Sequence, residues 1–149
     1  MTRITVIGAT GNQGGSVARS LLQNPSFQVR AITRNSSSSA SQKLSAAGAE
    51  VFQADGFNPE EIRAAFADTW GAFININSDD KVFTVPDGPN EYDMGKIMVD
   101  AAAQAGVKHL VFSSAASCTE MTGGKVQMKA MDSELPFKTY ICIGHKLTV

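Results

Sequence analysis

Glycines recur near the N-terminus in a run over residues 8–15, with a spacing typical of a turn that binds a diphosphate. The run reads Gly-Ala-Thr-Gly-Asn-Gln-Gly-Gly. It follows a short apolar segment typical of a buried strand, residues 4–7, and it leads into a helical pattern over residues 14–23. Glycines there allow a sharp turn and a close approach of backbone to ligand, and the N-terminus of a helix attracts phosphate. The run therefore predicts a site for the pyrophosphate of a dinucleotide. The alternative is a glycine-rich loop of structural use only.

One basic residue, Arg34, indicates which dinucleotide would bind. Domains that prefer NAD carry an Asp or Glu about 20 residues after the glycine run, where it binds the ribose hydroxyls. No acidic residue occurs between Gly15 and Ala49, and Arg34 follows the second predicted strand instead. A guanidinium suits the additional phosphate of NADP. The prediction is NADP(H), with NAD(H) as the weaker possibility. The alternative is an exposed arginine without a ligand.

No set of residues predicts a catalytic centre or a metal site. Tyr92 and Lys96 have the Tyr-x-x-x-Lys spacing of short-chain dehydrogenases, but they precede the fifth predicted strand, whereas the catalytic pair belongs after it. Ser113 ends that strand, and we interpret it as a residue beside the cofactor or a structural one. His109 and His145 lack the partners of a metal site or a catalytic triad. The catalytic residues are therefore left unassigned.

The elements that would position these residues alternate along the chain. Strands are expected at residues 4–7, 28–33, 50–53, 72–76, 109–113 and 139–143, and helices at 14–23, 42–47, 59–66, 90–105 and 125–132. Residues 36–39 are expected to be a mobile loop, and Asp79 and Asp80 a solvated turn. The alternation predicts an α/β fold, a Rossmann-type doubly wound parallel sheet in three layers with strand order 3-2-1-4-5-6.

Composition favours a single soluble domain. The chain has 149 residues, 43% of them hydrophobic and 18% charged, with a formal net charge of -1. This balance gives no general attraction to nucleic acid or to anionic membranes, and no apolar run approaches the length of a membrane span. We expect no nucleic-acid partner, no membrane association and a cytoplasmic location, with a nuclear one as the alternative.

The first part of the chain resembles a known family. Residues 8–35 are similar to the N-terminal signature of NmrA-like proteins, which are atypical members of the short-chain dehydrogenase/reductase group. The likeness continues through residues 51–55, 72–75, 95–96 with 100–102, and 109–114, and it extends to about Ser133.

The resemblance implies a set of cofactor contacts. The pyrophosphate would be held by Gly8, Ala9, Thr10, Gly11, Asn12 and Gln13, and the 2′-phosphate by Arg34. The adenine would lie beside Asp55 and Gly56, and the ribose near Ile76, Asn77 and Ser78. For Asp55 the alternative is a plain surface aspartate.

The resemblance also implies a role. It favours an oxidoreductase that acts on a small organic substrate, as in fungal secondary metabolism. The alternative is a non-catalytic, NADP(H)-sensing regulator that acts through a protein partner, and a third possibility is a chain that does neither. The sequence departs from the family pattern after Ser133. We therefore expect residues 1–149 to form one NAD(P)-binding domain from which the C-terminal substrate-binding region is missing.

Overall fold

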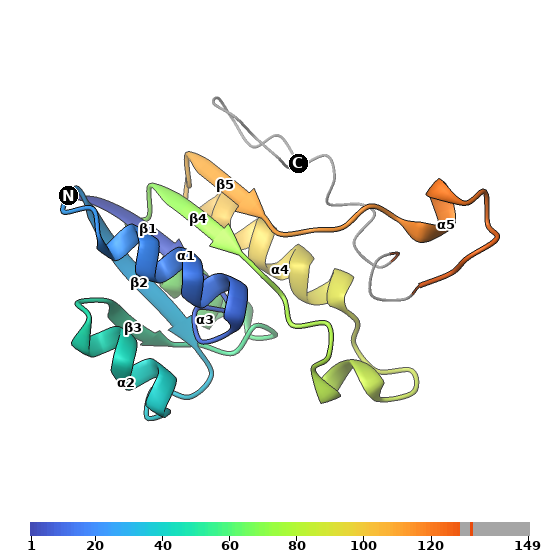
Figure 1. Ribbon diagram of the computed structural model, residues 1–149, viewed down its shortest axis with the longest axis horizontal. Coiled ribbons are helices and arrows are strands. Elements are labelled where there is room, and N and C mark those ends of the chain that lie inside the picture. Colours follow the sequence, from blue (N-terminus) through green and yellow to red (C-terminus); the bar gives the residue numbers. More distant parts are fainter. Residues whose placement is uncertain (129–131, 133–149) are drawn as a thin grey trace.

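A parallel sheet of five strands forms the centre of the fold (Figure 1). The computed structural model describes residues 1–128 and 132. The strands lie in the spatial order β3 (Glu50–Gln53), β2 (Phe27–Thr33), β1 (Thr2–Val6), β4 (Gly71–Ile74) and β5 (His109–Phe112), and every pairing is parallel. The predicted fold class is confirmed, as is the order of its first five strands. The strand predicted at 139–143 lies outside the described residues.

Helices connect these strands and cover both faces of the sheet. They are α1 (Asn12–Leu22), α2 (Ser39–Ala46), α3 (Pro59–Ala65) and α4 (Glu91–Gln104), with a short 3₁₀ helix, η1 (Lys81–Thr84), and a single turn, α5 (Cys118–Met121). The start of α3 follows the predicted signals, because the Asn58 side chain accepts from the Glu60 and Glu61 amides and Pro59 occupies the first turn. No helix of the described residues is long and apolar enough to cross a membrane.

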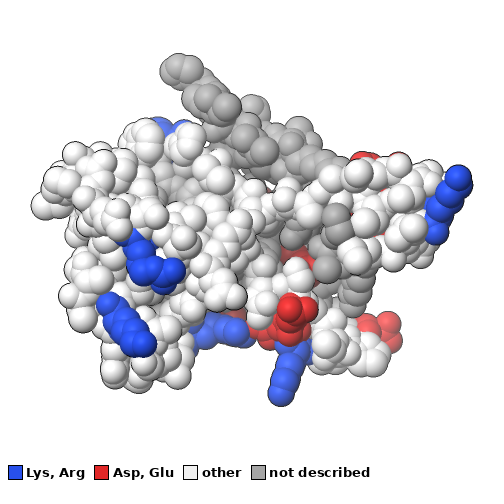
Figure 2. Space-filling view, in the orientation of Figure 1, with Lys and Arg blue, Asp and Glu red and all other residues white. Residues whose placement is uncertain are grey.

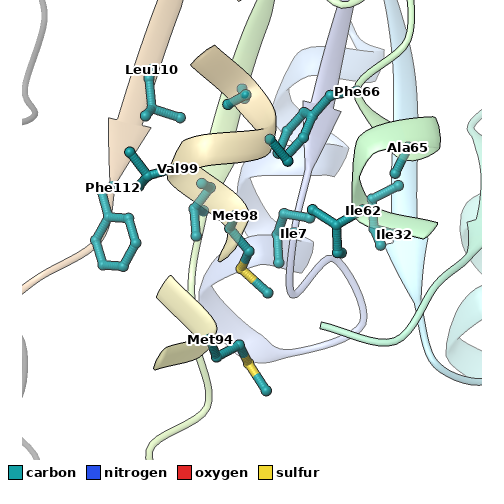
Figure 3. Packing of buried hydrophobic residues seen from close by; sticks show 14 of the residues in the cluster. Ile7, Ile32, Ile62, Ala65, Phe66, Met94, Met98, Val99, Leu110 and Phe112 are labelled. Carbon is teal, nitrogen blue, oxygen red and sulfur yellow. The ribbon is translucent and has the colours of Figure 1, made fainter. Parts of the chain in front are cut away.

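The apolar core lies in two layers, one on each face of the sheet. Side chains of α1 and α2 pack on one face, and side chains of α3 and α4 pack on the other. Figure 3 shows the second layer, where Phe66 and Ile62 are fully buried. Burial of each such side chain stabilises the fold by roughly 1.5–3 kcal/mol. The alternation of β1 fits this arrangement, because Ile4 and Val6 belong to the first layer while the Thr5 hydroxyl bonds the Thr69 hydroxyl at 2.7 Å.

Two local predictions differ from the structure. Residues 36–38 lie in a loop as predicted, but α2 begins at Ser39 rather than at residue 42, because the Ser38 side chain accepts from the Ser41 amide and caps the helix. Residues 125–128 are not helical. Gly123 and Gly124 precede them with φ of 61° and 82°, so the backbone leaves the helical conformation there.

Candidate functional site

A cavity of ≈ 520 Å³ opens at the carboxyl edge of the sheet. It lies where the strand order changes direction, since the chain passes from β1 to β2 and β3 on one side and then returns to β4 and β5 on the other. Ligands of open α/β sheets bind at this switch point. The volume falls within the range of about 300–1,000 Å³ that is usual for sites of small molecules and cofactors.

The glycine run forms the turn at the rim of this cavity. Gly8 has a φ of 73°, and the Gly11 amide donates to the Gly8 carbonyl at 3.0 Å. A Cβ at Gly8 would lie 2.6 Å from the Asn75 carbonyl oxygen, and one at Gly14 would lie 2.3 Å from the Gly8 oxygen. Side chains are therefore excluded from both positions, and strand, turn and helix approach one another closely. The glycine turn has the geometry expected of a phosphate-binding loop.

The first helix begins at this turn without a side-chain cap. Gly11 is the N-cap residue of α1 and offers no side-chain oxygen to the amides of the first turn. The first amides of a helix have no partner within it, and the helix dipole places a partial positive charge there. Together with the shape of the glycine turn, this leaves a cradle that fits the pyrophosphate of a dinucleotide.

The six residues predicted to hold the pyrophosphate lie together. Five of them line the cavity: Gly8, Thr10, Gly11, Asn12 and Gln13. Ala9 does not, because its side chain is buried in the core layer beneath α1. The Gln13 side chain is held in place by Ser113, whose Oγ donates to Oε1 at 2.8 Å. The Ser113 amide in turn donates to the Ile74 carbonyl at 2.8 Å, so the end of β5 supports the glycine turn.

Arg34 lines the cavity directly after β2, and it carries an ion pair that the sequence did not predict. Its Nη1 lies 2.5 Å from Oδ2 of Asp80, and the Arg34 side chain is 64% exposed whereas that of Asp80 is 15% exposed. The other carboxylate oxygen of Asp80 accepts from the Val82 amide at 3.2 Å and caps η1. The prediction that Asp80 belongs to a solvated turn was therefore wrong, because the cap and the ion pair hold its carboxylate against the cavity.

Of the two residues predicted near the adenine, one lines the cavity and the other does not. Gly56 is buried and lines the cavity, where a Cβ would meet the ends of Met94 and Met98 at 3.0 and 2.9 Å. Asp55 is exposed and is not among the lining residues. Its carboxylate accepts from the Phe57 amide at 3.0 Å and closes a local turn. The geometry of Asp55 fits the alternative of a surface aspartate.

The floor of the cavity is apolar. It is formed by side chains from strand ends, η1 and α4, namely Ile7, Ile32, Ala54, Ile76, Phe83, Met94 and Met98. Figure 3 shows Met94 and Met98 projecting from α4. Of the residues predicted near the ribose, Ile76 and Asn77 line the cavity and Ser78 does not.

Sequence reasoning missed several of these lining residues. Ile7, Ile32 and Ala54 lie at carboxyl ends of strands, so the rule that ligands bind at that edge could have found them. Phe83 and the methionines of α4 carried no local signal, because only tertiary packing brings η1 and α4 to the cavity.

The ionisable side chains of the cavity lining are Arg34 and Asp80, which pair with each other. The lining includes neither Tyr92 nor Lys96, and the Lys96 Nζ lies 2.5 Å from Asp100 Oδ2 on the same helix. His109 begins β5, and its ring stacks on Trp70 at 5.8 Å. Residues 1–128 and 132 contain no group of His, Cys, Asp and Glu that could hold a metal ion. The cavity therefore has the features of a binding site, and among the residues that the structure describes its lining contributes no free acid or base.

The segment after β5 is tied together by one carboxylate. Asp132 accepts from the Thr119 amide at 2.9 Å, from the Ser117 hydroxyl at 2.7 Å and from the Met128 amide at 2.7 Å. These hydrogen bonds, led by that from the Thr119 backbone, hold the pKa of the Asp132 carboxyl well below its ordinary value. Asp132 therefore has a structural role in this segment.

On the face that Figure 2 shows, the Lys and Arg side chains of the described residues are scattered rather than grouped in one basic patch.

Known proteins resemble the chain in sequence and in fold. The model of the NmrA-like family matches residues 1–141. An NmrA-like family domain-containing oxidoreductase of Aspergillus flavus is 64% identical over 137 residues, which are 92% of this chain and 41% of the relative. A second, from Cladobotryum, is 66% identical over 137 residues, again 92% and 41% of the two chains. The chain thus spans about 41% of the length of these relatives.

A solved structure gives the same result for the fold. The NADPH-dependent quinone oxidoreductase of Escherichia coli, complexed with NADPH, superposes with a TM-score of 0.69 at 25% identity, over 93% of this chain and 44% of that protein.

Proposed function

The chain belongs to the NmrA-like family, and from this premise we propose that it forms the NADP(H)-binding part of an oxidoreductase acting on a small organic substrate. The observation that carries the proposal is the cavity at the switch point of the sheet, where the glycine turn, the start of α1 and Arg34 lie around one space. Relatives that cover 92% of this chain are named oxidoreductases, which supports the reaction class.

Different residues of the cavity bind different parts of the proposed cofactor. The backbone of the glycine turn and the amides at the start of α1 bind the pyrophosphate. The Arg34 guanidinium, at the end of β2, binds the 2′-phosphate with its planar array of donors. The part of the cavity lining that includes Gly56 and Met98 receives the adenine. When bound, the nicotinamide supplies or accepts a hydride.

The reacting end of the cofactor lies, in this proposal, over the ends of β4 and β5. Asn77 lies beyond β4 and contributes to the cavity lining there. Ser113 orients Gln13 between the glycine turn and β5. Asn77 and Gln13 position the dinucleotide in this proposal, and Ser113 holds Gln13 in place. Both oxidoreductase relatives are fungal proteins, and we place the reaction in fungal secondary metabolism, as the resemblance implies.

A second candidate is a non-catalytic sensor that binds NADP(H) and changes its contacts with a protein partner. The observation that favours it is the pairing of Arg34 with Asp80, because these ionisable groups of the described cavity lining are engaged with each other rather than available for proton transfer. Oxidation of NADPH that depends on an added carbonyl or quinone compound would exclude a pure sensor. Capture of a partner that depends on NADPH, without such oxidation, would favour it.

Fluorescence titration of the chain with NADPH and with NADH tests the shared premise of both candidates. We expect saturable binding of both dinucleotides, with NADPH bound more tightly. Absence of binding by either would overturn the proposed function. Equal affinities would overturn the assignment of Arg34 to the 2′-phosphate and leave the glycine turn as a dinucleotide site.

A further inference from the structure

Asp80 reaches the cavity from the loop after β4, on the opposite side of β1 from Arg34. Arg34 follows β2, and β1 lies between β2 and β4 in the sheet, so the ion pair connects the two sides of the cavity. The group that would select a phosphorylated cofactor is thus already occupied by an anion of the protein itself.

We propose that Asp80 sets the discrimination between phosphorylated and unphosphorylated dinucleotides, because its carboxylate occupies Arg34 until a 2′-phosphate displaces it. The inference rests on the proposed binding of NADP(H). The selectivity of the site then depends on how much more strongly Arg34 interacts with the 2′-phosphate than with the Asp80 carboxylate. NADPH must displace the Asp80 carboxylate, whereas NADH leaves the pair intact.

The contacts of Asp80 and of η1 limit how the Asp80 carboxylate can move when a 2′-phosphate displaces it. One carboxylate oxygen pairs with Arg34, and the other accepts from the Val82 amide at the start of η1. Phe83, in the same 3₁₀ turn, is 6% exposed, and its ring meets that of Phe57 at 6.1 Å in an edge-on contact. Because Phe83 anchors η1 in the core, displacement of Asp80 is a movement of its side chain and not of the whole segment.

A carboxylate that stays near the 2′-phosphate also repels it. Two anions held beside one cation repel each other, and the partly buried position of Asp80 reduces screening of this repulsion by solvent. Removal of the charge at position 80 therefore frees Arg34 and removes the repulsion, and both effects favour NADPH alone.

The substitution Asp80→Asn isolates this effect. Asparagine has nearly the same shape, and its Oδ1 still accepts from the Val82 amide, because Asn is as good an N-cap as Asp. The matched control is Asp79→Asn, which removes the same charge from the adjacent residue. Asp79 is exposed and does not belong to the cavity lining.

Titrations of the wild-type chain and both variants with NADPH and NADH test the proposal. We expect Asp80→Asn to tighten NADPH binding by about 3- to 10-fold. Its effect on NADH, and all effects of Asp79→Asn, should stay within about twofold. In an Arg34→Ala background Asp80→Asn should still relieve the repulsion but can no longer free Arg34, so the gain should be smaller than in the wild type. If Asp80→Asn does not fold, Asp80→Ser supplies a neutral cap for the same comparison.

The outcomes separate this proposal from the one on which it rests. If the wild type binds NADPH more tightly than NADH but Asp80→Asn leaves the NADPH/NADH ratio unchanged, or lowers it, Asp80 does not compete for Arg34 and only the present inference is overturned. A change of equal size in both variants would identify a general charge effect and overturn it as well. Failure of the wild type to bind either dinucleotide would overturn both proposals together.

Discussion

Replacement of Arg34 by alanine should weaken NADPH binding much more than NADH binding. The side chain lines the cavity at the end of β2, and it is the basic residue of the described cavity lining. NADH lacks the phosphate that the guanidinium would contact. In the wild type NADPH displaces Asp80 from Arg34 whereas NADH leaves the ion pair intact, so the change in the ratio of the two affinities is the phosphate interaction less the ion pair.

The size of the effect follows from two opposing contributions. Hydrogen bonds to charged groups stabilise a complex by about 1.5–3 kcal/mol. Arg34 gives up its ion pair with Asp80 to make them, and ion pairs that involve an exposed side chain contribute about 0.2–1 kcal/mol. The net contribution is about 0.5–2.8 kcal/mol, which corresponds to a loss of roughly 2- to 110-fold in the preference for NADPH over NADH.

Fluorescence titration with the two reduced dinucleotides measures this ratio directly. Arg34→Lys should give an intermediate loss, because lysine retains the charge but not the planar array of donors. The matched control is Arg63→Ala, since Arg63 is also exposed and paired with an acid, Glu60, but lies on α3 outside the cavity lining. Equal losses for NADPH and NADH in Arg34→Ala, or a similar change in Arg63→Ala, would refute the assignment of Arg34 to the 2′-phosphate.

Three further substitutions test the contacts that hold the cavity and the sheet in place. Gly14→Ala places a Cβ 2.3 Å from the Gly8 carbonyl oxygen, so both dinucleotides should lose at least about tenfold in affinity, and unchanged binding would contradict the close packing of turn and helix. Ser113→Ala removes the hydrogen bond to Gln13, and titration should show about threefold weaker binding of both cofactors without a change in thermal unfolding. Arg30→Ala removes a buried guanidinium that donates to two backbone carbonyls, and urea unfolding should show a loss of about 3 kcal/mol while the folded fraction still binds NADPH.

Features encoded by neighbouring residues could be predicted from the sequence. The strand before the glycine run, the turn at Gly8 and the start of α3 at Pro59 depend on side chains and φ angles within a few residues of one another. The carboxyl edge of the sheet then followed from the alternation of strands and helices. The prediction at residues 125–128 was wrong because two adjacent glycines with positive φ outweighed a weak helical pattern.

Features that depend on residues distant in sequence could not be predicted in this way. Phe83 and Met98 reach the cavity through the packing of η1 and α4 on the sheet. Asp80 appeared in the sequence as half of an acidic pair in a polar loop, and nothing near it indicated Arg34 as a partner. The two acids of this pair differ in their surroundings, since Asp79 is exposed while the Asp80 side chain is only 15% exposed and caps η1.

The pairing of Arg34 changes what a basic residue at the end of the second strand implies about cofactor preference. A free guanidinium would contribute its whole interaction with the 2′-phosphate to selectivity. A guanidinium that already holds a carboxylate contributes only the difference between its two anions, and for an exposed pair this difference is sensitive to ionic strength. The preference for NADPH should therefore decrease as salt is added, and Asp80→Asn should enlarge it at every salt concentration. An NADPH/NADH ratio that is independent of salt would place the source of selectivity elsewhere in the cavity.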